Sequence, residues 1–396
     1  MFDFEEKIDR RGTGSAKWAH APEAVKLAGE IPLSVADMEL RCPKAVTEAL
    51  HKAADHGIYG YTIADEEYFS ATRDYLKRRH GYEVEREWML NTHGIVPAVG
   101  LAVRALTEAG DAVLVCPPVY YPFYSAIEKN GRKIYRSQLL LKNGKYEMNF
   151  PEFEDLCARD EVKLFIMSSP HNPVGRVWSA EELREIARIC KENNVFVIAD
   201  EIHCDIILPG NRHTSFITVP DGRDNCMLCT AISKTFNLAG LNCSDIFIPN
   251  AEARAKIAKK LDDEGAFGIG YFSRAASIAA HTECDDWLDA MILHVNGNFE
   301  LMYKFIKERL PELSCIRAEG TYLAWVDMRA LGLSNEEQER MDVEDAKLAL
   351  DEGYVFGMGG EGFSRWNLAA PRAEILRALE RFEKAINALQ KKRGLR

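Results

Sequence analysis

The sequence lacks any apolar stretch long enough to cross a bilayer, and its first residues, MFDFEEKIDRRG, lack the apolar core of a secretory signal. We therefore expect a cytoplasmic protein with no membrane partner. Basic runs are also missing, apart from residues 391–393, and the formal net charge is -11. Nucleic acid is consequently not an expected partner, because its backbone attracts basic surfaces.

Cysteine motifs are scarce as well. The ten cysteines are scattered through strand-like and helical segments, so we expect reduced thiols in the core. One pair, Cys226 and Cys229, forms a CxxC, but it lies in an apolar run with no second pair nearby. A structural metal centre normally uses four ligands, so the sequence predicts no metal site.

The chain does have the size and patterning of a large globular protein. Its 396 residues are 47% hydrophobic, enough for a core in two or more subdomains. Between residues 43 and 248, helical and strand-like segments alternate. Four short runs are almost continuously apolar, which suits strands covered on both faces of a parallel sheet. They are residues 111–118, 162–170, 194–201 and 225–233.

Several helices carry recognisable start and stop signals. In SAEELREIARICKENN, Ser179 and Glu182 are placed for a capping box. VPAVGLAVRALTEAGD predicts a helix opened by Pro97 and stopped at Gly110. Residues 372–392 space their apolar side chains by four and three in turn, which predicts one helix with a single buried stripe.

These elements predict an α/β fold: a mostly parallel central sheet with helices on both faces, plus a smaller α+β domain. The strand-like segments 320–328 and 364–370 and the last helix are assigned to the small domain. We expect a large domain at 46–286 and a small C-terminal domain at 287–396. Residues 1–45 are expected to pack with the small domain.

Polar and aromatic residues follow each of the four apolar runs. In a parallel sheet the ligand binds beyond the carboxyl ends of the strands, so we expect these residues to converge on one edge. They are Tyr120 and Tyr121, Asn172, Asp200 and His203, and Ser233 and Lys234.

A flat, anionic, electrophilic cofactor such as pyridoxal phosphate (PLP) would use each of these side-chain types. PLP needs a lysine amine for a Schiff base, here Lys234, and a carboxylate for its ring nitrogen, here Asp200, because a protonated ring is the better electron sink. Asn172 can donate to the phenolic oxygen with help from His203, and Tyr120 can stack on the ring. Singly, each residue also has an ordinary structural explanation, but jointly they predict a PLP site.

The phosphate of such a cofactor needs backbone donors at the start of a helix. In THGIVP, residues 92–97, Gly94 and Ile95 form a glycine turn that leads into the predicted helix. Ser233 can add a hydroxyl group. A simple turn into the helix is the alternative interpretation of this string.

The strings SSPHNPVG, ADEIH, SKTFNLAG and RWNLAAPR resemble those of fold type I PLP-dependent enzymes, the class I and II aminotransferase group, over nearly the whole chain. RRGTGSAKW, VADMEL, HGIYGYT and PPVYYPFY resemble its cystathionine β-lyase or cysteine-S-conjugate carbon–sulfur lyase branch. The histidine of ADEIH, where aminotransferases more often carry tyrosine, favours the same branch. The resemblance implies a fold type I lyase that depends on PLP.

The resemblance also implies roles for single residues. Lys234 would be the Schiff-base lysine, and Arg365 of RWNLAAPR would bind the carboxylate of a small amino-acid substrate, since a guanidinium grips a carboxylate in two parallel bonds. Ala36 of VADMEL would contact the same substrate. Tyr61 matches the tyrosine that, in relatives, reaches the phosphate of the neighbouring subunit. This implies a homodimer whose active sites are completed by the neighbouring subunit.

The chain departs from the family pattern at two places. Relatives usually carry a basic residue eight or nine positions after the lysine, but here Asn242 and Cys243 occupy those positions. Phosphate binding would then rest more on backbone donors and Tyr61. Ser34 replaces an aromatic residue before VADMEL, which predicts a reshaped substrate end.

The expected reaction is a β-elimination. Lys234, once displaced by the substrate amine, removes the α proton, a thiolate leaves, and the products are a thiol, pyruvate and ammonia. Tyr121 is the candidate for proton transfer. Cystathionine and a small cysteine conjugate fit equally well. Two alternatives stay open: an aminotransferase, and a non-catalytic PLP-binding regulator, although the chain has no basic helix-turn-helix extension to read DNA.

Overall fold

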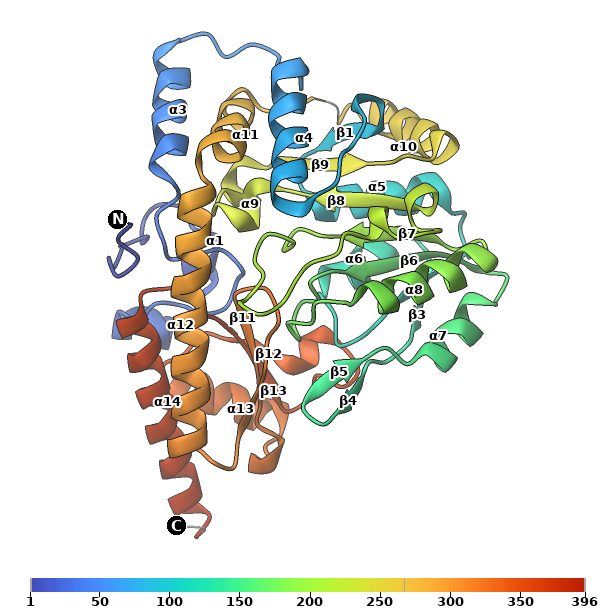
Figure 1. Ribbon diagram of the computed structural model, residues 1–396. Coiled ribbons are helices and arrows are strands. Elements are labelled where there is room, and N and C mark those ends of the chain that lie inside the picture. The colour runs from blue at the N-terminus through green and yellow to red at the C-terminus, as the bar shows by residue number, and fades with distance from the viewer. Residues whose placement is uncertain (1, 267, 395–396) are drawn as a thin grey trace.

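The large sheet of the computed structural model, which describes residues 2–266 and 268–394, has seven strands in the order β1-β9-β8-β7-β6-β2-β3 (Figure 1). β9 is antiparallel to both of its neighbours, and the pairs from β8 to β3 are parallel. The predicted α/β class with a mostly parallel sheet is confirmed. The strands are β1 (Met89–Thr92), β2 (Ala112–Val115), β3 (Lys133–Arg136), β6 (Val162–Ser168), β7 (Phe196–Asp200), β8 (Cys226–Thr230) and β9 (Ser244–Phe247).

Both faces of this sheet are buried, as continuous apolar strands require. Along β2, Val113 and Val115 belong to one core cluster and Ala112 and Leu114 to the other, because successive side chains point to opposite faces. The four predicted runs are present as β2, β6, β7 and β8. One face carries α5 (Ile95–Leu106), α6 (Pro122–Glu128) and α10 (Ala251–Asp263); the other carries α7 (Phe150–Cys157) and α8 (Ala180–Glu192).

The helix predictions were confirmed in two cases and corrected in a third. The capping box of α8 is present, and α14 spans Arg372–Lys392 as predicted. α5 begins at Ile95, before Pro97, and ends at Leu106, well before Gly110. Proline is accepted inside the first turn because the N–H groups there have no partner in the helix, so it does not have to open it.

The capping box of α8 gives a direct stability prediction. The Ser179 hydroxyl accepts from the Glu182 N–H at 3.2 Å, and the Glu182 carboxylate accepts from the Ser179 N–H at 2.8 Å. Ser179→Ala should lower the free energy of unfolding by about 1 kcal/mol, because one N–H at the helix start loses its partner. Urea denaturation measures this. Ser179→Asp keeps an acceptor and should unfold close to wild type; equal losses in both variants would contradict the prediction.

A second, antiparallel sheet lies beside the large one, in the order β10-β11-β13-β12. Its strands are β10 (Ser314–Ile316), β11 (Leu323–Asp327), β12 (Asp351–Glu352) and β13 (Phe363–Asn367). The long helices α12 (Asp285–Arg309) and α14 run side by side past it in Figure 1, and α13 (Asn335–Arg340) lies nearby. Residue 287, the predicted start of the small domain, is in the first turn of α12. The domain limits stay a prediction.

The N-terminal segment contacts this second sheet through its backbone. The Leu33 N–H donates to the Ala349 carbonyl at 2.9 Å, and the Asn367 N–H donates to the Leu33 carbonyl at 2.8 Å. The remaining α-helices and β-strands are α1 (Ala16–His20), α2 (Glu23–Ala28), α3 (Lys44–Asp55), α4 (Glu66–His80), α9 (Ile232–Thr235), α11 (Tyr271–Glu283), β4 (Leu140–Lys142) and β5 (Lys145–Glu147).

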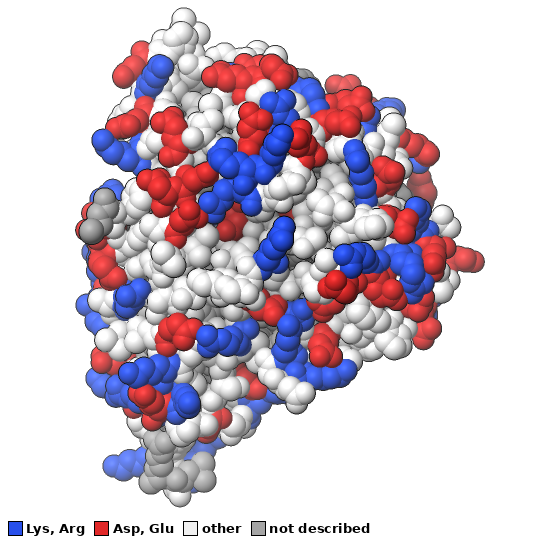
Figure 2. Space-filling model, viewed as in Figure 1, with Lys and Arg blue, Asp and Glu red and all other residues white. Residues whose placement is uncertain are grey.

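The structure can be compared with the expectations from composition for membrane-spanning helices, cysteines and surface charge. Across residues 2–266 and 268–394, no helix combines the length and apolarity needed to span a membrane. All ten cysteines are free thiols, and eight are buried, which confirms the prediction of core thiols. Acidic and basic side chains are mixed over the face shown in Figure 2.

Candidate active site

A cavity of about 370 Å³ lies at the carboxyl ends of β6, β7 and β8, beside the first turn of α5. Segments far apart in sequence form its wall, because parallel strands end at the same edge of the sheet. The structure brings together nine of the twelve predicted site residues here: Ala36, Gly94, Ile95, Tyr120, Asn172, Asp200, His203, Ser233 and Lys234.

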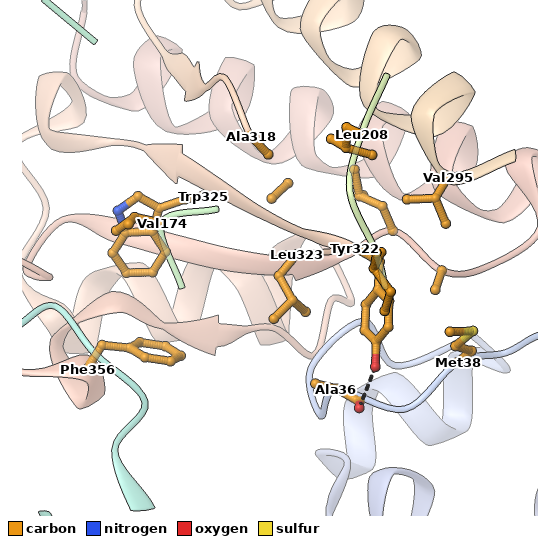
Figure 3. Packing of buried hydrophobic residues seen from close by; sticks show 14 of the residues in the cluster. Ala36, Met38, Val174, Leu208, Val295, Ala318, Tyr322, Leu323, Trp325 and Phe356 are labelled. Carbon is orange, nitrogen blue, oxygen red and sulfur yellow. Dashed lines mark hydrogen bonds between the residues drawn. The ribbon is translucent and has the colours of Figure 1, made fainter. Parts of the chain in front are cut away.

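Lys234 lies in α9, the short helix that follows β8. Its Nζ donates to the Ala36 carbonyl at 2.6 Å, and the Tyr322 hydroxyl donates to the same oxygen at 2.8 Å. Figure 3 shows Tyr322 pointing toward Ala36. Burial lowers the pKa of Lys234 to about 8, against the opposing effect of the Asp37 charge. A neutral amine, the form that acts as nucleophile or base, is therefore accessible near physiological pH.

Asp200 is the last residue of β7 and is 6% exposed. Burial raises the pKa of its carboxyl group to about 7, although a hydrogen bond from the Ile202 N–H (3.1 Å) and the charge of Lys234 oppose the shift. A carboxylate this deep is stabilised as the anion only by a nearby cation or further donors. A ligand that presents a protonated nitrogen would meet this need.

Asn172 is oriented by Arg365, from β13 of the second sheet. Arg365 Nη1 donates to Asn172 Oδ1 at 3.0 Å, which leaves the Asn172 amide nitrogen as a donor for a ligand. Arg365 also forms an ion pair with Asp351, and its Nε is buried without a hydrogen-bond partner in residues 2–266 and 268–394. A substrate carboxylate that binds Arg365 would compete with Asp351 and satisfy this donor.

His203 and Tyr120 give the cavity an aromatic wall. His203 is 3% exposed, and burial lowers its pKa to about 3, so its ring is neutral at physiological pH. Its Nδ1 is buried and finds no hydrogen-bond partner among the described residues. Burial raises the pKa of Tyr120 to about 12, which keeps the phenol protonated. These neutral rings suit the flank of a planar ligand.

The first turn of α5 opens into the cavity. Gly94, its N-cap residue, has φ 128°, a conformation that favours glycine, and no side chain caps the helix. The N–H groups of the first turn have no partner within the helix, so they are available to an anion. Asn242 and Cys243 line the same cavity, which places the departure from the family pattern at the site. Among the described residues that line the cavity, Lys234 is the only lysine or arginine.

Three predicted residues lie outside the cavity lining. Arg365 is buried behind Asn172, as described above. Tyr121 is 40% exposed, and its ring contacts Phe356 edge-on at 5.7 Å between centroids. Tyr61 is fully exposed in the loop between α3 and α4. Tyr61 is not among the described residues that line the cavity.

Sequence reasoning missed His93 and Asn237. His93 lines the cavity beside Gly94, and its place in the THGIVP string was the available signal. The Asn237 side chain accepts from the Met38 N–H at 2.9 Å and donates to the carbonyl of Leu40 at 2.9 Å. It thus holds the segment around Ala36 against the segment around Lys234. No local sequence pattern indicates this contact.

Comparison with known proteins places these features in a family. Residues 28–382 match the model of the family described as aminotransferase class I and II. The chain is 39% identical over 386 residues to "Cystathionine beta-lyase PatB" of Bacillus subtilis (strain 168), covering 97% of this chain and 100% of that one. Cystalysin of Treponema denticola, whose crystal structure contains PLP, has a TM-score of 0.94 and 39% identity, covering 98% and 100% of the two chains. A PLP-bound C-S lyase of Staphylococcus hominis has a TM-score of 0.89 and 31% identity, covering 98% and 98%.

Proposed function

The chain belongs to the aminotransferase class I and II family, and from that premise we propose that it is a PLP-dependent carbon–sulfur β-lyase. One observation carries the proposal: a single cavity joins the Lys234 amine, whose pKa is lowered, to the Asp200 carboxylate, which forms no direct ion pair with any described residue. The choice of elimination is supported by relatives named as a cystathionine β-lyase and a C-S lyase over almost the whole chain.

The residues that line the cavity fit PLP. Lys234 can bind its aldehyde, and Asp200 can hold a proton on its ring nitrogen. The free amide nitrogen of Asn172 and the orphaned Nδ1 of His203 offer polar partners for the ring substituents. The uncapped first turn of α5 offers N–H groups to the phosphate, with the Ser233 hydroxyl beside it.

When bound, PLP supplies an aldehyde for the substrate amine and an aromatic ring that stores the electron pair left by the α proton. Lys234, as the neutral amine, takes that proton. The carbon–sulfur bond then breaks and its electron pair leaves with sulfur, which takes up a proton; Tyr121 is the candidate donor. The remaining three-carbon fragment is hydrolysed to pyruvate and ammonia.

The substrate is a small sulfur-containing amino acid. Arg365 would bind its α-carboxylate, because its Nε is an unsatisfied buried donor and its position is held by Asn172 and Asp351. The carbonyl of Ala36 lies at the same wall as Lys234. We place the enzyme in the cytoplasm, which agrees with ten free cysteines.

The function is tested by giving the PLP-loaded protein cystathionine in the absence of any keto acid. Elimination should release one pyruvate for each thiol formed, and the cofactor should keep its aldehyde form. If turnover requires an added keto acid and the cofactor accumulates as the amine, the protein is an aminotransferase. PLP binding with no turnover on a panel of amino acids would favour the regulator.

The lowered pKa of Lys234 can be measured directly. In the cofactor-free protein, acylation of Lys234 by a small reagent should be half-maximal near pH 8, because burial disfavours the ammonium form against its usual value of 10.5. Competitive labelling with peptide mass spectrometry gives this midpoint. Lys256, an exposed lysine of α10, is the internal reference for reagent reactivity. A midpoint near 10.5 for Lys234 would contradict the prediction.

The proposed active unit is a homodimer. The loop between α3 and α4 exposes four large apolar side chains together, which is costly for a single chain in water. They are Ile58 (70% exposed), Tyr59 (55%), Tyr61 (111%) and Ile63 (73%). In a dimer, Tyr61 of one subunit would supply a hydroxyl to the phosphate of the other.

Tyr61→Phe should therefore weaken PLP binding about 10-fold, the effect of one lost hydrogen bond to a charged group, while the dimer persists. Equilibrium dialysis gives the affinity, and analytical ultracentrifugation gives the assembly. Tyr59→Phe is the matched control, because its hydroxyl donates to the Ala54 carbonyl of its own chain at 2.6 Å. Equal PLP affinities in both variants would count against the role of Tyr61.

A further inference from the structure

A second cavity, of about 640 Å³, lies between the C-terminal end of α4, the loop after β7 and α12. The proposed reaction uses none of its side chains. Two arginines at its edge are neutralised, since Arg78 pairs with Asp285 and Arg79 pairs with Asp289. Its wall also contains histidine, cysteine and aspartate side chains, which are metal-binding types.

Three of these side chains cluster tightly. The donor atoms of His80, Cys204 and Asp205 all lie within 4.8 Å of one another, and His80 Nε2 is 2.7 Å from Asp205 Oδ1. Cys204 is buried at 4% exposed, and the side chains of His80 and Asp205 are 9% and 7% exposed. His80 and Asp205 are 125 positions apart, so no sequence spacing could reveal the cluster.

His213 is an independent observation beside this cluster. Its ring centroid is 5.8 Å from that of His80, at 83°, and it lines the same cavity. Its Nε2 is 2.9 Å from a carboxylate oxygen of the buried Glu201, while its Nδ1 is buried and has no hydrogen-bond partner in the part of the chain that the structure describes. His213 therefore packs edge-on against the His80 ring and is itself held by Glu201, so it supports His80 from outside the group of donor atoms, as residues around a metal site do.

We propose that His80, Cys204 and Asp205 bind a zinc-class divalent ion, with water in the fourth position. Mixed nitrogen, sulfur and oxygen donors suit zinc and not magnesium or calcium, which prefer oxygen alone. A thiolate and a carboxylate together cancel the two charges of the ion, so the buried centre is neutral. Binding releases the thiol proton of Cys204 to solvent. From the lone CxxC we expected no metal site. The cluster of His80, Cys204 and Asp205 was not part of that argument, because it is formed by residues distant in sequence.

The ion would join two segments that are distant in sequence, the end of α4 and the loop after β7. It would also share Asp205 with the active-site region, because the other carboxylate oxygen accepts from the Thr235 hydroxyl at 2.6 Å, and Thr235 follows Lys234. None of the three ligands lines the active-site cavity, so occupancy of the site should appear as thermal stability and not as a requirement for turnover.

The test uses the PLP-loaded protein, freed of metals by a chelator and titrated with Zn²⁺ against a chromophoric competitor. Wild type should bind one Zn²⁺ per chain, and its melting temperature should rise on binding. Co²⁺ in place of Zn²⁺ should give a thiolate-to-cobalt absorption in the difference spectrum against Cys204→Ser. None of these readouts depends on lyase turnover, so failure here and failure of the proposed function are distinguishable.

Three variants make the test specific. Cys204→Ser and His80→Gln should each lose stoichiometric binding, whereas His213→Gln should bind about 10- to 100-fold more weakly. Cys42→Ser, a partly exposed thiol outside the cluster, should behave as wild type. Melting curves without metal establish that each variant is folded. Absence of one-to-one uptake by wild type, or uptake that Cys204→Ser leaves unchanged, would overturn the proposal.

Discussion

Lys234→Ala should abolish elimination, with a fall in kcat of at least about 1,000-fold. The lysine contributes twice: it attaches the cofactor, and as a neutral amine it takes the α proton, a role that alone is worth roughly 100- to 10,000-fold. Its lowered pKa, caused by burial, makes this second role possible near neutral pH. Alanine supplies neither group.

Three measurements separate chemistry from folding in this variant. Pyruvate release gives the rate, intact mass after borohydride reduction shows whether the cofactor is covalently attached, and circular dichroism reports the fold. Lys234→Arg is the control, because it retains a cation that can donate to the Ala36 carbonyl but cannot attach the cofactor. Activity in Lys234→Ala above about one tenth of wild type would refute the assignment.

The second large effect is expected for Asp200→Asn, which should lower kcat about 100- to 10,000-fold with PLP still bound. An amide has nearly the shape of the carboxylate and can still accept from the Ile202 N–H, but it cannot stabilise a protonated ring nitrogen by its charge. The electron sink is therefore weakened while the cavity keeps its form.

Asp245→Asn is the matched control for this variant. Asp245 is also a fully buried carboxylate whose pKa burial raises to about 7, and it accepts from the Tyr68 hydroxyl at 2.8 Å. It lies in β9 and does not line the active-site cavity. We expect its replacement to change stability much more than kcat. Equal losses of kcat in the two variants would show that burying an amide, and not the missing charge, is responsible.

The sequence was sufficient for features that depend on local pattern and on one topological rule. Continuous apolar runs predicted β2, β6, β7 and β8, and S/T-x-x-E spacing predicted the start of α8. Because parallel strands end at one edge, the residues after those runs were expected to meet, and Asn172, Asp200 and Lys234 do line one cavity. Local chemistry and topology together therefore located the candidate site.

Features that depend on contacts between distant segments were beyond the sequence. Nothing near Arg365 indicates that its partners are Asn172 and Asp351. The start of α5 was misplaced because Pro97 is tolerated inside a first helical turn, so the proline did not mark its first residue. In each case, three-dimensional packing decided an outcome that the local residue pattern left open.

The carbonyl oxygen of Ala36 is shared by Lys234 and Tyr322, and a carbonyl has two lone pairs. Once the lysine amine forms a covalent bond elsewhere, one of those lone pairs becomes vacant and the N-terminal segment loses its hydrogen bond to α9. The state of one nitrogen atom is thereby transmitted to the segment that bridges the two sheets. Cofactor attachment at Lys234 and the order of the Ala36 segment therefore depend on the same hydrogen bond.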